Sequence, residues 1–168
     1  MAADEERDGL LLDTSVAIAL IVEDHEAHVS ALEAVGGKRL GLAGHAWFET
    51  YSVLTRLPGG ARRSPVDAVG ILQRNFPFPA FLGQAEATSL GVELARLGIS
   101  GGAVYDALVG AAARQHRRRL LSADERARRV YDALGVDVTM LESTARPIDG
   151  PAETTKTAPT TGDGEENG

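Results

Sequence analysis

Short apolar segments, each followed by a longer stretch with helical periodicity, recur along this chain of 168 residues. Residues 8–12, 38–42, 119–122 and 136–139 are too short for helices and apolar enough to be buried strands. Strands that alternate with helices favour a parallel sheet with right-handed crossover connections. The pattern therefore predicts an α/β fold.

The length and composition suit one folded domain with a polar segment at each end. With 43% hydrophobic residues the chain can bury one core. We predict an acidic leader over residues 1–8, the folded domain over 9–145, and a disordered tail over 146–168, where Pro, Thr, Gly and Glu dominate. No apolar run is long enough to span a membrane and there is no cysteine, so we expect a cytoplasmic protein without disulfides.

The formal net charge of −7 comes mostly from the two ends of the chain. Residues 1–9 and 150–168 each contribute −3, which leaves the body of the protein at −1. Within that body, residues 114–129 contain seven arginines against two acids. A basic segment of this density attracts polyanions. Arginines at a helix end also complement the helix dipole, and this alternative stays open for each of them.

Four acidic residues fall where the predicted topology would bring them together. Asp13 follows the first strand and Asp124 follows the strand over 119–122. The carboxyl ends of parallel strands lie at one edge of the sheet, where such sheets bind ligands. Glu49 and Asp106 lie on predicted helices that can pack over the same edge. Crowded carboxylates repel one another, and a divalent cation between them relieves the repulsion.

Three of these acids also have ordinary structural explanations. Asp13 is a favoured residue for capping the helix that follows it. Asp124 lies between Ser122 and Glu125, whose spacing is that of a capping box, and this spacing predicts a helix beginning at residue 124. Glu49 lies on a polar helical face and can form a surface ion pair with the residue seven positions later, Arg56.

Asp106 is harder to explain by solvation alone. Its helical neighbours Gly102, Ala103, Val109 and Gly110 are small or apolar, so no polar face surrounds it. A charge in such a setting needs a partner or a metal ion. We expect the small neighbours to leave room for a ligand.

The sequence resembles PIN-domain ribonucleases, and more narrowly the toxins of the VapC type. The resemblance covers about residues 9–140 and is carried by the order and context of four blocks. In this family threonine is more common at the position of Ser122. The blocks are Leu11–Ser15, Glu49, Ile99–Leu108 and Leu120–Ala127.

The resemblance implies a three-layer α/β/α fold with a central parallel sheet of about five strands. It also implies an endoribonuclease that depends on Mg²⁺ (or Mn²⁺), in which attack of water leaves 3′-hydroxyl and 5′-phosphate ends. Further implications are a small antitoxin partner and a homodimer. The residues assigned by motif position are the acidic quartet Asp13, Glu49, Asp106 and Asp124, with Thr14, Ser15 and Ser122 as supporting groups. Within the quartet we expect Asp13, Asp106 and Asp124 to be the metal ligands. From the basic segment we expect contacts to RNA phosphates by Arg114, Arg117, Arg118 and Arg119.

Two other functions remain open at this stage. A PIN-like fold can serve only as a binding module, without catalysis. A phosphotransferase or phosphatase acting through an aspartyl phosphate would use Asp13 as its nucleophile. That chemistry usually has a second acid two residues later, where this chain has Ser15.

Overall fold

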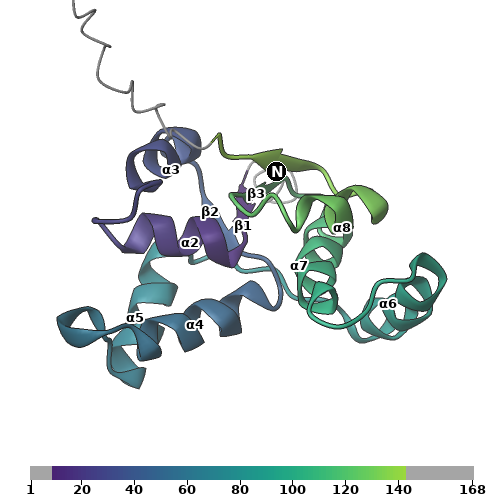
Figure 1. The fold of residues 1–168 in the computed structure, drawn as a ribbon, viewed down its shortest axis with the longest axis horizontal. Coiled ribbons are helices and arrows are strands. Elements are labelled where there is room, and N and C mark those ends of the chain that lie inside the picture. Colours follow the sequence, from purple (N-terminus) through teal and green to yellow (C-terminus); the bar gives the residue numbers. More distant parts are fainter. Residues whose placement is uncertain (1–8, 143–168) are drawn as a thin grey trace, which may run out of the picture.

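A computed structural model describes residues 9–142 of the chain. The predicted leader and tail, and the last residues of the predicted domain, lie outside the described residues. The described part contains one sheet of four parallel strands, in the order β2–β1–β3–β4 (Figure 1). The strands are β1 (Leu10–Leu12), β2 (Leu40–Leu42), β3 (Leu120–Ser122) and β4 (Val138–Met140).

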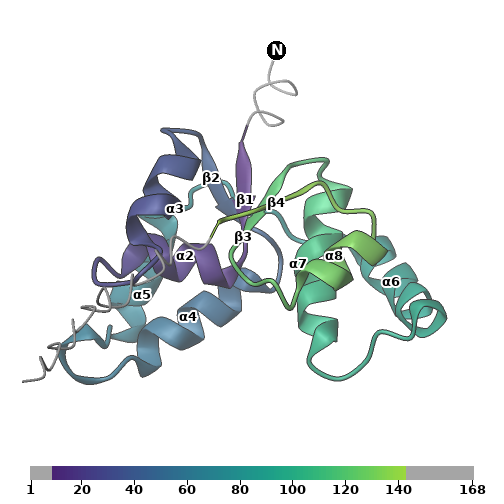
Figure 2. The ribbon, with the colours of Figure 1, turned by 45° about the horizontal axis from the view of Figure 1, so that its top comes forward.

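Helices cover both faces of this sheet, which lies between them in Figure 2. None of the described helices is long and apolar enough to cross a membrane. One group of helices comprises α2 (Thr14–Ile21), α3 (His28–Val35), α4 (Ala46–Arg56) and α5 (Pro65–Asn75), with the short 3₁₀ helix η1 (Gly59–Ala61). The other comprises α6 (Gln84–Leu97), α7 (Ala103–Gln115) and α8 (Arg128–Ala133).

The central strand β1 supplies side chains to both sides of the sheet. Leu10 and Leu12 pack in one hydrophobic cluster with residues of α2, α3, α4 and α5. Leu11 points the other way and packs in a second cluster with residues of α7 and α8. Successive strand residues face opposite sides, so an unbroken apolar run is what a strand covered on both faces requires. The predicted three-layer α/β/α architecture is confirmed.

The described sheet has four strands, as many as the apolar segments of the sequence predict, whereas the family resemblance implied about five. An extended segment, residues 76–80, nevertheless runs along the outer edge of β2. Phe78 donates its N–H to the carbonyl of Leu40 at 3.2 Å, and Ala80 donates to Leu42 at 3.0 Å. Pro77 and Pro79 alternate with these two residues and have no N–H to continue the ladder outward. This segment therefore closes the sheet edge without forming a regular strand.

Candidate active site

The four acidic residues line a single cavity of about 200 Å³ at the carboxyl ends of the central strands. In the sheet, β2 is the neighbour of β1 on one side, and β3 is its neighbour on the other side. Such a reversal of strand order opens a crevice that is the usual ligand site in parallel sheets. The residues lining the cavity are Asp13, Thr14, Ser15, Glu49, Asp106, Val109, Asp124 and Tyr131.

Asp13 is buried at the bottom of this cavity, with 5% of its surface exposed. One carboxylate oxygen accepts hydrogen bonds from the backbone N–H of Val16, at 3.1 Å, and from the Ser15 hydroxyl. The other accepts a hydrogen bond from the Ser122 hydroxyl. Burial raises the pKa of Asp13, while the hydrogen bonds from Ser122 and Ser15 act in the opposite direction. Asp13 is therefore both the cap of α2 and part of the acidic cavity.

Two serines connect the beginning of α2 to the segment after β3. The Ser15 hydroxyl accepts a hydrogen bond from the N–H of Ala123 at 2.8 Å. The Ser122 hydroxyl accepts one from the N–H of Asp124 at 3.1 Å. Because Ser122 is engaged in this way, the predicted capping box does not form, and α8 begins at Arg128 instead of residue 124.

Glu49 reaches the cavity from α4 and accepts a hydrogen bond from the Thr14 hydroxyl at 2.7 Å. The alternative partner, Arg56, turns back along its own helix and donates to the carbonyl of Ser52 at 3.1 Å. Glu49 is thus tied to the residue that follows Asp13, and the simple surface ion pair with Arg56 is absent from the described residues.

Asp106 projects from the first turn of α7, and no described residue donates a hydrogen bond to it. Partial burial, followed by the neighbouring charges of Asp124, Glu49 and Asp13, raises its pKa to about 6, although the charge of Arg126 acts in the opposite direction. This carboxylate is therefore destabilised in the metal-free protein and is available to a cation.

Tyr131 forms one wall of the cavity and is almost completely buried. A methyl group added at Gly110 would lie 2.9 Å from the ring of Tyr131. Gly110 on α7 thus makes room for the ring of Tyr131. The space beside Gly110, which we expected a ligand to use, is filled by this ring. Burial, followed by the charges of Asp13 and Asp106, raises the pKa of the Tyr131 hydroxyl, which stays protonated at neutral pH.

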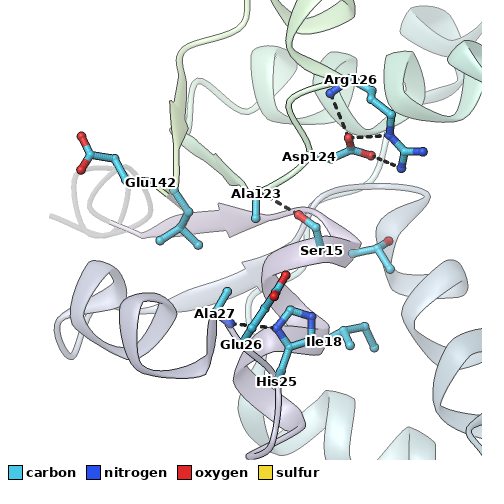
Figure 3. A pocket seen from close by; sticks show the side chains of 11 residues that line it. Ser15, Ile18, His25, Glu26, Ala27, Ala123, Asp124, Arg126 and Glu142 are labelled. Carbon is cyan, nitrogen blue, oxygen red and sulfur yellow. Dashed lines mark hydrogen bonds and ion pairs between the residues drawn. The ribbon is translucent and has the colours of Figure 1, made fainter. Parts of the chain in front are cut away.

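Asp124 lies at the rim of the cavity and is paired with Arg126 (Figure 3). The guanidinium donates to both carboxylate oxygens, each at 3.0 Å, and the Arg126 N–H adds a third hydrogen bond at 2.9 Å. This pairing lowers the pKa of Asp124. Sequence reasoning missed Arg126, although it lies in the arginine-rich segment two residues after a predicted site residue.

The chain matches the PIN domain family over residues 10–133. Ribonuclease VapC27 of Mycobacterium tuberculosis (strain ATCC 25618 / H37Rv) is 45% identical over 131 residues, which cover 78% of this chain and 96% of that protein. This chain belongs to the PIN-domain family. Ribonuclease VapC40 of Mycobacterium tuberculosis (strain CDC 1551 / Oshkosh) is 39% identical over 131 residues, covering 77% of this chain and 96% of that protein. The predicted resemblance to VapC-type proteins is confirmed.

Solved structures of related shape agree on the fold. FitAcB from Neisseria gonorrhoeae matches with a TM-score of 0.54 and 18% identity, covering 77% of this PIN-domain chain and 95% of that chain. FitAB bound to the IR36 DNA fragment matches with a TM-score of 0.54 and 17% identity, covering 78% and 94%. At these identities the likeness concerns the fold alone.

Three of the four arginines that we predicted to bind RNA have structural contacts in this PIN domain. Arg114 forms a bidentate ion pair with Glu93 of α6, with its shorter contact at 2.7 Å. Arg119 pairs with Asp137 at 3.2 Å. Arg118 is buried and donates to backbone carbonyls at the beginning of β1.

These residues lie at the amino end of β3, whereas the acids lie at the carboxyl ends of the strands. Arg117 follows the end of α7 and lies at the same amino end. The structure does not bring these arginines to the acidic cavity. Their contact with RNA stays a prediction.

The donor set of the cavity suits a hard divalent cation, because carboxylate oxygens are the ligands that Mg²⁺ prefers. The carboxylates are not preassembled as a metal site, however. Among the described residues, no group of three His, Asp or Glu side chains stands ready to hold a metal ion together. The contacts give the reason at Asp124, where both oxygens are occupied by Arg126.

An aspartyl-phosphate mechanism fits the cavity poorly. Both oxygens of Asp13 accept hydrogen bonds, and the residue is buried. A nucleophilic carboxylate needs one oxygen that can approach phosphorus in line. Ser15, which stands where the second acid of such enzymes is expected, serves instead to hold Asp13 and Ala123.

Proposed function

We propose that this PIN-domain protein is a metal-dependent endoribonuclease and the toxin of a toxin–antitoxin pair. The observation that carries the proposal is the convergence of Asp13, Glu49, Asp106 and Asp124 on one cavity at the crevice between β1 and β3. The relatives that are 45% and 39% identical over nearly their full lengths, both named ribonucleases, support the same activity.

In this proposal Asp13, Asp106 and Asp124 hold Mg²⁺ or Mn²⁺, and Glu49 lies close enough to assist. The bound ion would supply positive charge that stabilises the negative charge developing at the scissile phosphate. Ser15 and Ser122 hold the carboxylate of Asp13 in one orientation. Asp106 contributes oxygens without a hydrogen-bond donor, which makes it the residue most in need of the cation.

A protein partner is the second part of the proposal, either an antitoxin or a second copy of the chain. An apolar groove of about 440 Å³ beside α4 supports it, since Phe48 and Phe81 are 55% and 44% exposed there. Exposed apolar surface of this kind commonly marks protein interaction sites. Two other apolar residues near the end of α4 belong to the core instead, because Leu54 is fully buried and Leu57 packs against the same cluster.

The activity is tested with purified protein, single-stranded RNA and Mg²⁺. We expect cleavage that stops with a chelator and falls by about 100-fold or more in D106N, as for loss of a group that stabilises transition-state charge. D132N is the matched control, since Asp132 is an exposed aspartate on α8 outside the acidic cavity. Mapping the RNA ends reports whether they carry a 3′-hydroxyl and a 5′-phosphate. Equal cleavage by D106N and the wild type would overturn the proposal.

A binding module without catalysis predicts a different result. Calorimetric titration with Mg²⁺ or Mn²⁺ would then give no heat, and RNA would bind without being cut. Measuring metal binding and cleavage on the same preparation therefore separates the two functions.

A further inference from the structure

Asp124 stands at the junction of two cavities. The acidic cavity lies on one side, and a larger cavity of about 480 Å³ lies on the other. Both are lined by Thr14, Ser15 and Asp124, so the two cavities adjoin at these residues. Arg126 lines only the larger one, and its side chain is 92% exposed (Figure 3).

Arg126 occupies the part of Asp124 that a metal ion would need. Its Nε and Nη2 atoms donate to the two different carboxylate oxygens, so neither oxygen is free of a donor. A guanidinium fork matched to a carboxylate in this way gives two charge-assisted hydrogen bonds in one geometry, while the exposure of Arg126 keeps the net stabilisation small. The guanidinium of Arg126 therefore already neutralises the charge of Asp124.

We infer that Arg126 exchanges partners: it neutralises Asp124 in the metal-free protein, and once Asp124 binds a divalent ion it holds a phosphate of the RNA strand at the larger cavity. The inference rests on the proposed nuclease function. It assigns Arg126 two roles of opposite effect, a competitor for the metal site and a contact that positions the substrate.

The surroundings of Arg126 suit this exchange. Its side chain is exposed, so it can leave Asp124 without unpacking any core residue. The larger cavity is in the size range of sites for small organic ligands, such as one nucleotide. Glu26 and Glu142 also line this cavity, and Figure 3 shows Glu142 on the side opposite Arg126. Because these acids repel phosphate, the end of the cavity at Arg126 is the place where a phosphate is favoured.

The test substitutes Arg126→Gln and measures two affinities. Mn²⁺ titration by calorimetry should show binding about two- to fivefold tighter than in the wild type, the factor expected for removal of an exposed competing ion pair. Binding of a single-stranded RNA, measured with Ca²⁺ in place of Mg²⁺, should weaken. The slope of log affinity against log salt concentration should become shallower by about 0.7, the value for one lost contact to a single-strand phosphate.

Arg128→Gln is the matched control, because Arg128 carries the same charge two residues later but pairs with Glu125 at 3.6 Å. It should change neither Mn²⁺ affinity nor the salt slope. Arg126→Lys separates the two roles, since lysine keeps the charge for a phosphate but lacks the bidentate fork for Asp124. We expect tighter Mn²⁺ binding in this variant with the salt slope preserved.

Equal Mn²⁺ affinity in the wild type and Arg126→Gln, or an unchanged salt slope in Arg126→Gln, would overturn the role of Arg126. A wild-type protein that binds no Mn²⁺ and cuts no RNA would instead overturn the proposed function on which the inference rests. A single set of titrations and one cleavage assay therefore tell the two failures apart.

Discussion

The hydroxyl of Ser122 donates a hydrogen bond to the buried carboxylate of Asp13, although the two residues are 109 positions apart in the chain. Ser122 is the last residue of β3, and Asp13 directly follows β1, so the contact joins the ends of the two central strands. Both residues are buried, with 5% of Asp13 and none of Ser122 exposed. The same bond that holds the site in shape therefore also contributes to the stability of the fold.

We predict that S122A lowers the free energy of unfolding by about 2 kcal/mol, the usual range for losing a hydrogen bond to a charged group. The N–H of Asp124 loses its acceptor in the same variant. Urea denaturation at pH 7.5 followed by circular dichroism measures the change. S122T keeps the hydroxyl and should lose less, although its added methyl group enters a fully buried position. A loss in S122T as large as in S122A would mean that packing, and not the hydrogen bond, sets the stability here.

Asp106 should make the metal-free protein less stable at neutral pH. Its pKa in the folded protein is raised to about 6 from an ordinary value of 3.8, so the folded state binds more protons than the unfolded state between these values. Stability due to this group therefore falls as pH rises from about 4 to about 6, and the full loss is present above that window.

D106N removes this unfavourable charge, so we predict higher stability than the wild type at pH 7.5 without metal. The gain should be about 1 kcal/mol, after allowance for solvent screening of a half-buried group. The difference should shrink as the pH is lowered through 6 and be small near 4. Thermal unfolding in a chelator at several pH values measures it, with D132N as the control. Saturating Mn²⁺ should reverse the order, because the wild type gains more from binding the ion.

The elements and the acids could be read from the sequence because each depends on local pattern. Strands buried on both faces must be apolar throughout, which makes residues 10–12 recognisable. Asp13 was marked by its place after such a strand, and Asp106 by the absence of a polar face around it. The order of the strands was not predicted from the sequence, because the crossover rule fixes the handedness of the connections and not which strands are neighbours.

Features that depend on contacts between distant segments could not be read in this way. Ser122 and Glu125 have the spacing of a capping box, yet Ser122 binds Asp13 from another strand and α8 begins later. Arg126 looked like one more arginine in a basic segment until the fold placed it against Asp124 at the edge of a cavity. Local sequence describes what a residue can bind, and the fold decides which partner it meets.

Gly41 on β2 should tolerate no side chain. A methyl group there would lie 1.8 Å from the carbonyl oxygen of Phe78, in the extended segment that covers the sheet edge. We predict that G41A destabilises the protein by about 3 kcal/mol, as expected when atoms are forced into a filled space. G91A is the control, because nothing lies within 4 Å of a methyl group at this exposed position of α6.

In G91A the helix propensity of alanine should raise the unfolding free energy by about 0.5–1 kcal/mol. Both changes are measured by urea denaturation under identical conditions. If G41A proves as stable as the wild type, residues 76–80 do not lie against β2 as described.

Two neighbouring arginines between α7 and β3 should have opposite effects on stability. Arg118 is buried and donates to the carbonyls of Gly9, Leu10 and Phe78, the last at 2.7 Å. Arg117 is exposed and has a φ of 51°, a left-handed conformation that favours glycine. The first residue therefore holds three segments together, and the second carries backbone strain.

We predict that R118M lowers the free energy of unfolding by about 3 kcal/mol, because it leaves buried carbonyls without donors. R117G should raise it by about 0.5–1 kcal/mol, because glycine adopts a positive φ at no steric cost. R117A keeps the strained backbone and removes only the side chain, so it should resemble the wild type. A gain in R117A equal to that in R117G would assign the effect to the lost charge. Relief of backbone strain would then be excluded as its cause.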